Sequence, residues 1–413
     1  MLKRLKNGSE DLKGSAYMEE KHSDGDRDFK LFLLAGLFAG IGAGINTSIF
    51  NNYLNDIFML SESVRGFLEV PREAPGFFIM LVLAVLSFAG DVRIAMLGMA
   101  AAGLGMLGLG LLSPTFAVMI IWMMMYSLGT HMVMPVTPSI GMSLSKLGSF
   151  GARLGTISAF GLFGSIIAYV FVFLSFHFLN MTYQIAFIIG AVFYVFAALA
   201  VGLMKKGEPK ARKVKFVFRK RYTLYYVLAG VSGARAQIFL TFAPWVLIKV
   251  FNVQPQMFAI LGMIVAFVSI GTRKMIGRLI DVRGERFVLT VEAALLFAIC
   301  LGYAFSADIF PVGIAAVIIA ACYVIDNSMA AVEMARSTYL RKIAVDLDDV
   351  TPTLSTGVSL QHIASMVIPI FGGLLWAAFG YQAVFMGAAV IAFLNFILSR
   401  RIKIELDPAA KAE

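Results

Sequence analysis

The sequence predicts an all-α membrane protein whose twelve transmembrane helices form two pseudo-symmetric six-helix bundles. Of its 413 residues, 59% are hydrophobic and 15% are charged, and the mean hydropathy is +0.83. A soluble domain has about a quarter of its residues charged. Apolar runs long enough for a crossing of roughly 20 residues recur from Leu31 to Leu398. In lipid, continuous runs of this kind satisfy their backbone groups as helices.

Twelve spans can be assigned to these runs in chain order. They cover residues 30–51, 64–89, 94–112, 115–136, 155–178, 183–204, 222–250, 257–279, 287–305, 311–334, 357–379 and 382–399. The domain organisation we expect is a cytosolic tail (1–28), a first bundle (29–204), a basic linker (205–221), a second bundle (222–400) and a cytosolic tail (401–413).

Lysine and arginine occupy alternate connections between the spans, which predicts that both termini are cytosolic. The linker 205–221 alone holds nine basic residues against Glu208. We interpret it as an orientation signal that contacts anionic lipid, with binding of a cytosolic partner as the alternative. The basic residues are spread over the alternate connections between the spans and are not gathered on one face. The net charge of +10 therefore does not indicate a nucleic-acid partner. We expect a multi-pass protein of a plasma membrane or a bacterial inner membrane.

An internal repeat relates the two expected bundles. A shift of 190 residues places AGIGAG (39–44) on AGVSGA (229–234), and the same shift places Asp91 on Asp281 and Arg93 on Arg283. One offset that matches two separate places indicates duplication of a six-helix unit, as in the parallel repeats of transporters.

The connection between the eighth and ninth spans carries the most specific motif. It reads GRLIDVRGER at 277–286 and resembles the cytoplasmic-loop signature of the major facilitator superfamily, through Gly277, Asp281, Arg283, Gly284 and Arg286. When the shift of 190 residues is applied to this motif, Ser87 and Ile94 of the first half take the places of Gly277 and Gly284. Of the motif residues, only Asp91 and Arg93 remain in the first half. The resemblance covers residues 30–400 and implies the superfamily's two-bundle fold, a central cavity and transport by rocking of one half against the other.

The resemblance further implies that the first, fourth, seventh and tenth helices line the cavity. We expect the solute to contact polar side chains on these helices, namely Arg235, Gln237, Asn46, Asn51, Tyr226, Asn327 and Tyr126. Arg235 lies about 13 residues into its span, roughly 20 Å deep at 1.5 Å per residue. Ionisable groups at that depth are functional candidates by default. Arg235 either binds an anionic solute or pairs with Asp326.

The stretch LEVPREAPG (68–76) places charges and prolines in the second span. Arg65, Glu69, Arg72 and Glu73 recur at spacings of three and four residues, so that they share one helix face. Counting back from Asp91 puts Glu73 near the outer end of the helix, away from the cavity centre. Three interpretations remain open: a solvated helix end, an extracellular gate of ion pairs, and a carboxylate that carries a proton or contacts the solute. Pro71 and Pro75 are expected to bend the helix.

Two histidines lie within the spans, His131 in the fourth and His362 in the eleventh. Histidine changes charge near neutral pH, which suits proton coupling, but a histidine hydrogen-bonded inside a packed bundle is the alternative. Glu333 and Arg336 are three residues apart and are expected to form a cytoplasmic salt bridge.

Other chemistry finds no support in the sequence. GLGMLG (103–108) fits a dinucleotide pattern, but it lies inside an apolar span where tight helix packing explains it. Cys300 and Cys322 also lie in apolar runs and are expected to act as small hydrophobic residues. There is no pattern of a nucleophile with its base or of a metal-ligand cluster, so we expect neither an enzyme, nor a cofactor, nor a metal.

The predicted function is secondary transport of a small polar or anionic solute by alternating access, coupled to protons. In this interpretation Arg235 binds the solute, Glu69, Glu73 or Asp326 carries the proton, and the protein acts as a monomer in the lipid bilayer. The alternatives are an efflux antiporter of amphipathic compounds and a non-transporting receptor of the same fold. Efflux is weakened because the fifth span, GTISAFGLFGSIIAYVF, lacks the proline of the glycine-proline signature that drug antiporters of the superfamily share.

Overall fold

The computed structural model describes residues 2–145, 150–205 and 217–403, and it describes side chains from residue 25 onward within these ranges, except those of residues 150 and 347. Most of the expected linker (206–216) and of the last tail (404–413) lies outside the described residues. Within them, eleven helices are long and apolar enough to cross a membrane. One of these, α10 (Pro255–Ile309), has 55 residues and bends at Gly284. A helix of that length would measure about 80 Å against a hydrocarbon core of about 30 Å, so α10 holds two spans and the expected twelve are present.

The first half of the chain contains helices α1 to α8. Its second span is divided into four pieces, and the others are single helices. The bounds are α1 (Leu2–Phe58), α2 (Glu62–Phe67), α3 (Glu69–Phe77), α4 (Ile79–Val85), η1 (Leu86–Ala89), α5 (Asp91–Leu111), α6 (Phe116–Ser143), α7 (Phe150–Phe178) and α8 (Tyr183–Gly202).

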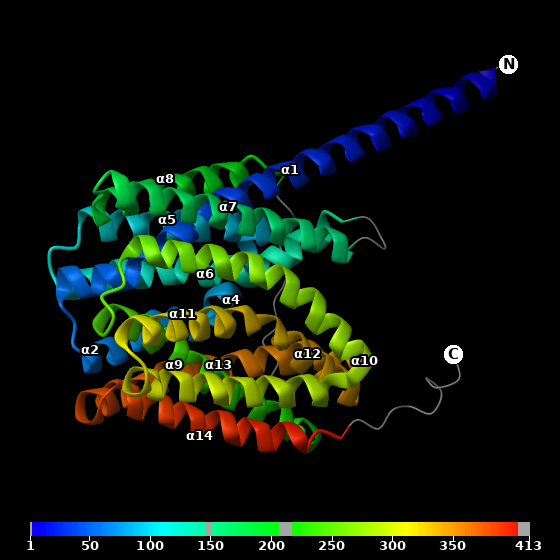
Figure 1. Ribbon diagram of the computed structural model, residues 1–413. Coiled ribbons are helices and arrows are strands. Elements are labelled where there is room, and N and C mark those ends of the chain that lie inside the picture. The colour runs from blue at the N-terminus through cyan, green and yellow to red at the C-terminus, as the bar shows by residue number, and fades with distance from the viewer. Residues whose placement is uncertain (1, 146–149, 206–216, 404–413) are drawn as a thin grey trace.

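The second half follows the same plan. Here the tenth span is the divided one, with a 3-10 turn between two helices. The bounds are η2 (Lys220–Tyr222), α9 (Thr223–Lys249), α10, α11 (Val312–Ser328), η3 (Met329–Val332), α12 (Glu333–Ile343), η4 (Leu347–Asp349), α13 (Val350–Phe379) and α14 (Tyr381–Arg400). Figure 1 shows the two halves side by side, with the start of α1 and the end of α14 at the same end of the bundle.

Local sequence explains where the helices begin and break. Ser61, Thr115 and Thr182 precede α2, α6 and α8, and each accepts a hydrogen bond from the backbone N–H three residues later. The second span breaks at Leu68 and Phe78. Pro71 and Pro75 have no N–H to donate to the carbonyls four residues before them, which weakens the helix in this region.

The turn glycines correct the register of the internal repeat. Gly90 (φ 75°) and Gly284 (φ 79°) adopt matching left-handed conformations between the second and third helix of each half. Gly90 therefore corresponds to Gly284, a shift of 194 residues (284 minus 90), so the shift of 190 does not hold at this turn. Asp91 then corresponds to Glu285, because each is the first residue after the turn glycine. Each also bonds to a neighbouring helix: Asp91 accepts a hydrogen bond from Ser139 of α6, and Glu285 pairs with Lys342 of α12 at 2.8 Å.

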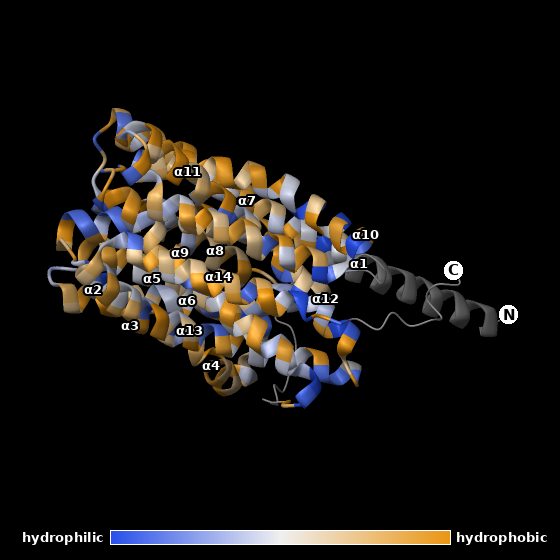
Figure 2. Cartoon of the chain, turned by 60° about the horizontal axis from the view of Figure 1, so that its bottom comes forward, coloured by the Kyte–Doolittle hydropathy of each residue, from blue (hydrophilic) through white to orange (hydrophobic). Residues whose placement is uncertain are grey.

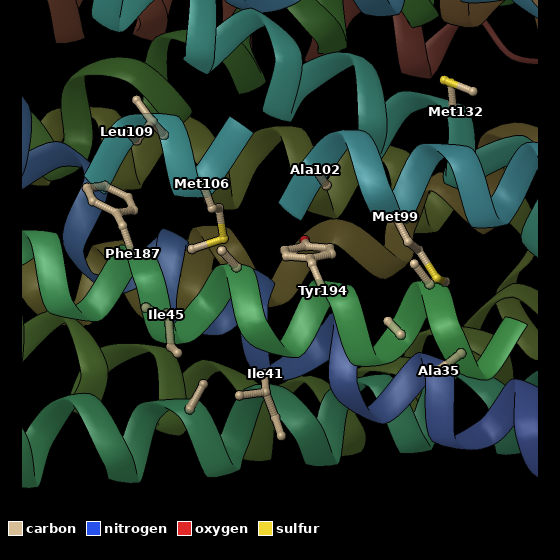
Figure 3. Packing of buried hydrophobic residues seen from close by; sticks show 14 of the residues in the cluster. Ala35, Ile41, Ile45, Met99, Ala102, Met106, Leu109, Met132, Phe187 and Tyr194 are labelled. Carbon is tan, nitrogen blue, oxygen red and sulfur yellow. The ribbon is translucent and has the colours of Figure 1, made fainter. Parts of the chain in front are cut away.

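Each half has its own apolar core, and its outer surface is apolar as well. In the first half, Met106 of α5 packs between Phe187 and Tyr194 of α8, all nearly inaccessible (Figure 3). Phe88 and Phe379 are 70% and 73% exposed. Figure 2 shows hydrophobic residues along most of the bundle and hydrophilic ones gathered towards its two ends. This is the pattern of a surface that faces lipid.

The two halves meet at the end of the bundle remote from the chain termini. A side chain at Gly66 of α2 would lie 2.2 Å from the backbone oxygen of Pro369 in α13, so the two backbones are in direct contact there. Asn52 of α1 donates a hydrogen bond to the carbonyl of Val253 (2.8 Å), beyond the end of α9. This arrangement joins α1, α2 and α3 of one half to α9 and α13 of the other, and we call it the junction.

Candidate functional site

A cavity of about 340 Å³ lies in the second half of the molecule, among α9, α10, α11, η3, α12 and α13. Four of its lining residues are predicted site residues: Arg235, Gln237, Asp326 and Asn327. The charged and amide side chains that the sequence analysis did not assign to the cavity are Glu292, Glu333, Arg336 and Gln361. The cavity is therefore strongly polar for a position inside a membrane bundle.

Arg235 and Asp326 form an ion pair within this cavity. Arg235 Nη1 donates to Asp326 Oδ1, and about a tenth of each side chain is exposed. The guanidinium also lies 5.1 Å from the centroid of the Phe239 ring. The ion pair is the second of the two interpretations given for Arg235. A charge buried in this way is costly unless it is paired, which accounts for the arrangement.

A second ion cluster lines the cavity nearer to the chain termini. Arg336 donates to Glu292 (3.2 Å) and to Glu333 (2.8 Å), and Glu292 is 4% exposed. The expected pair of Glu333 and Arg336 is confirmed, but Arg336 is buried, because it also pairs with Glu292 inside the bundle. Glu292 is an acidic residue in the ninth apolar run, and this signal was available in the sequence.

The charges of the cavity do not balance when all groups are ionised. Three carboxylates face two guanidinium groups, so that the lining carries one excess negative charge. Next to Asp326 the tenth span changes from α11 to η3, and the carbonyl of Ser328 accepts a hydrogen bond from Thr272 (3.1 Å). Asn327 donates to the carbonyl of Tyr323 (2.8 Å). The ion pair thus lies beside an irregular segment of backbone.

The four charged residues of the second span form a buried network, as their spacing predicts. Glu69 is 0% exposed and accepts hydrogen bonds from Arg65 and from Arg72 Nε (2.6 Å). Arg72 also pairs with Glu73 at 2.8 Å. The burial of Glu69 excludes the interpretation of this stretch as a solvated helix end.

The network continues across the junction into the second half. Glu69 accepts a hydrogen bond from Gln237 of α9 (2.7 Å), and Arg65 lies 5.8 Å from the ring centroid of Trp245 on the same helix. Arg65 also donates to Asn51 of α1 (3.1 Å). Gln237 lines the cavity, whereas no residue of LEVPREAPG does, so this stretch lies outside the cavity and is linked to it through Gln237.

The two histidines meet Glu73 at the same junction. His362 Nδ1 lies 3.1 Å from Glu73 Oε2, and the ring centroids of His131 and His362 are 5.3 Å apart. His131 Nδ1 lies 2.8 Å from the carbonyl oxygen of Ser127, which can only accept, so Nδ1 carries the proton of the neutral ring. These three side chains come from α3, α6 and α13, and no spacing in the sequence relates them.

Other predicted residues lie outside the cavity. Tyr226 donates to the carbonyl of Val217 near the start of α9, and the Tyr126 hydroxyl lies 3.4 Å from that of Tyr194 in the first half. Asn46 keeps its Oδ1 buried, with no hydrogen-bond partner among the described residues. None of the three lines the cavity.

The loop motif forms the turn that its glycine predicts. Gly284 has the left-handed conformation, Asp281 and Arg286 are exposed, and Arg283 lies 5.5 Å from the Phe287 ring centroid. Gly277 has open space where a side chain would stand. In the first half, Arg93 is exposed near the start of α5.

Solved structures share this fold. A bacterial homologue of the human lysosomal transporter Spinster, in an inward-facing and occupied conformation, matches with a TM-score of 0.69 and 16% identity, over 92% of this chain and 98% of that one. The nucleoside transporter NupG matches with 0.70 and 12%, over 90% and 98%. A D-xylose–proton symporter matches with 0.67 and 16%, over 91% and 97%. At these identities the likeness shows the fold alone.

Sequence comparison identifies the family. A search of curated protein sequences found no match. A profile of the Major Facilitator Superfamily matches residues 32–344, about three quarters of the chain. With the twelve spans and the structural neighbours, this match shows that the chain belongs to the major facilitator superfamily of membrane transporters.

Proposed function

We propose that the protein is a proton-coupled secondary transporter of a small polar solute bearing an anionic or oxygen-rich group. The observation that carries this proposal is the ion pair of Arg235 and Asp326 in the lining of the cavity. Arg235 offers donors in a planar fork, the geometry that suits carboxylates and similar oxygens. In the absence of solute, Asp326 occupies these donors.

The pair provides a simple route to coupling. An anionic or polar solute competes with the Asp326 carboxylate for Arg235, and protonation of Asp326 removes the competing charge. The same protonation removes the excess negative charge of the lining, which favours entry of an anion. Solute and proton therefore bind together, and coupling follows if the loaded and the empty protein favour different conformations.

The junction acts as the gate in this proposal. The network of Arg65, Glu69 and Arg72 holds the halves together at one end of the bundle and contacts Gln237 in the cavity lining. Loss or gain of the Gln237 contact therefore links the cavity to the gate. If both termini are cytosolic, as the distribution of basic residues predicts, this gate is on the outer side.

Purified protein in liposomes with an imposed pH gradient tests the function. The first solutes to test are sugars and nucleosides, which the structural neighbours suggest, followed by organic acids and cationic dyes. We expect uptake of at least one neutral or anionic solute, faster when the side of addition is acidic. Uptake that ignores the gradient for every accepted solute would rule out proton coupling.

The Arg235→Gln variant tests the solute contact. It removes the charge but keeps a donor, and we expect the apparent affinity for an anionic solute to fall by roughly 10- to 100-fold, the loss of one charged hydrogen bond. The matched control is Arg283→Gln, since Arg283 is exposed and outside the cavity. Unchanged affinity in Arg235→Gln would overturn the role of this residue.

Two other functions remain outcomes of these experiments. Preferential export of cationic dyes against protons would identify an efflux antiporter, and the excess negative charge of the cavity is the observation that favours it. A receptor without transport would protect a cysteine placed in the cavity from alkylation but would give no flux in liposomes.

A further inference from the structure

A cluster of three metal-ligating side chains lies at the junction, where the sequence analysis expected no metal. Glu73, His131 and His362 each offer one ligand atom, and these atoms all lie within 4.8 Å of one another. Tetrahedral ligands at 2.0–2.1 Å from zinc are roughly 3.3 Å apart, so small rotations of the side chains complete such a site. Two histidines with one carboxylate form a known zinc ligand set, in which a water takes the fourth position.

The surroundings of His131 prepare it as a ligand. Its Nδ1 donates to the carbonyl of Ser127 (2.8 Å), which leaves the lone pair of Nε2 free in the neutral ring. Metal-binding histidines commonly donate their other nitrogen to a backbone carbonyl in this way. A methyl group at Gly76 would lie 2.5 Å from His131 Nε2 and 2.6 Å from His362 Cε1. The absence of a side chain at this position therefore lets the two rings approach each other.

Glu73 faces His362 through one carboxylate oxygen and is held in place by an ion pair at the second. Arg72 pairs with Oε1 at 2.8 Å, while Oε2 faces His362. The charge of Arg72 is shared with Glu69, which it contacts at 2.5 Å, and Arg65 also pairs with Glu69. The two arginines and two glutamates balance, so an entering cation meets a neutral network. Nitrogen ligands with one carboxylate suit zinc and its neighbours, whereas magnesium and calcium prefer oxygen alone.

The geometry points to a binding site for a divalent transition metal ion of the zinc class, formed by Glu73, His131 and His362 across the junction. Glu73 and His131 belong to the first half of the molecule and His362 to the second. A bound ion therefore links the two halves at the junction. This consequence rests on the proposed function: transport by alternating access requires the halves to separate at the junction, so a bound ion should slow transport.

Metal binding can be measured without any solute. The purified full-length protein, stripped with a chelator, is titrated with Zn²⁺ by calorimetry or equilibrium dialysis. We expect about one ion per chain with a Kd of about 10 μM or tighter. Glu73→Gln, His131→Gln and His362→Gln should each weaken binding at least about tenfold, while His177→Gln, which alters a histidine stacked on Phe173, should leave it unchanged.

Substitution by cysteine separates ligation from a structural role. His362→Cys keeps a metal ligand, so it should retain binding where His362→Gln loses it. With Co²⁺ as the probe, the cysteine variant should add a sulfur-to-cobalt absorption band that the wild type lacks. Absence of Zn²⁺ binding by the folded wild type, or binding that survives all three glutamine variants, would overturn the site. Neither result depends on whether the protein transports a solute.

Discussion

Gln237 of α9 donates a hydrogen bond to Glu69 of α3 across the junction of the two halves, at 2.7 Å. Gln237 also lines the cavity that contains the ion pair of Arg235 and Asp326. One side chain therefore touches both the network that we propose as the gate and the cavity that we propose binds the solute. A solute that displaces Gln237 from Glu69 weakens the contact between the halves, which gives binding a direct physical route to opening.

The buried charges of the gate should contribute strongly to stability. Glu69→Gln leaves Arg65 and Arg72 short of one carboxylate inside the bundle, and removal of one partner of a buried ion pair costs about 3–5 kcal/mol. We expect a clear drop in the Tm of the purified protein. Asp26→Asn is the control, because Asp26 is 64% exposed and lies 3.6 Å from Arg153. Its effect should be below about 1 kcal/mol. Equal Tm values for the two variants would contradict the role of the network.

Close backbone contact at Gly66 should control closure of the junction. A methyl group there would stand 2.2 Å from the carbonyl oxygen of Pro369, so Gly66→Ala must separate α2 from α13. A cysteine at Ser63, in a background without Cys300 and Cys322, should then react several times faster with a water-soluble maleimide. Gly155→Ala, where a side chain finds open space, is the control. An unchanged rate in the Gly66→Ala protein would show that the junction tolerates the methyl group.

The turn glycine of the loop motif should be replaceable only at a cost. Gly284 has φ 79° and ψ 167°, a conformation that residues with a side chain rarely adopt, so Gly284→Ala should lower stability by about 1–3 kcal/mol. Gly277→Ala, in the helical part of the same motif, meets open space and should be neutral or slightly stabilising, since alanine favours the helix. Thermal unfolding of the two variants compares these positions. A smaller loss at Gly284 than at Gly277 would contradict this account of the turn.

The fold was predictable because it depends on the length of each apolar run and on the distribution of lysine and arginine between the runs, and both can be read directly from the sequence. The twelve spans follow from apolar runs, and the spacing of Arg65, Glu69 and Glu73 predicts a shared face. The repeat register was not predictable in this way. The same letters, Asp-Val-Arg, occur at different positions relative to the turn glycine in the two halves, and only the φ angles of Gly90 and Gly284 reveal this.

The site was predictable in part. Arg235 and Asp326 were predicted because they are ionisable residues in apolar spans, and both line the cavity. The same rule would have found Glu292. The junction could not be predicted, because His131, His362 and Glu73 come from three helices and no sequence spacing relates them.

The proton-coupling role of Asp326 is the central claim, and the Asp326→Asn variant tests it most directly. Wild-type protein in liposomes should accumulate its solute when a pH gradient is imposed, and Asp308→Asn, at an exposed carboxylate, should do the same. Asp326→Asn should still exchange labelled for unlabelled solute across the membrane, because Arg235 remains available, but it should no longer accumulate solute in response to the gradient. Gradient-driven accumulation by Asp326→Asn at the wild-type level would contradict the claim.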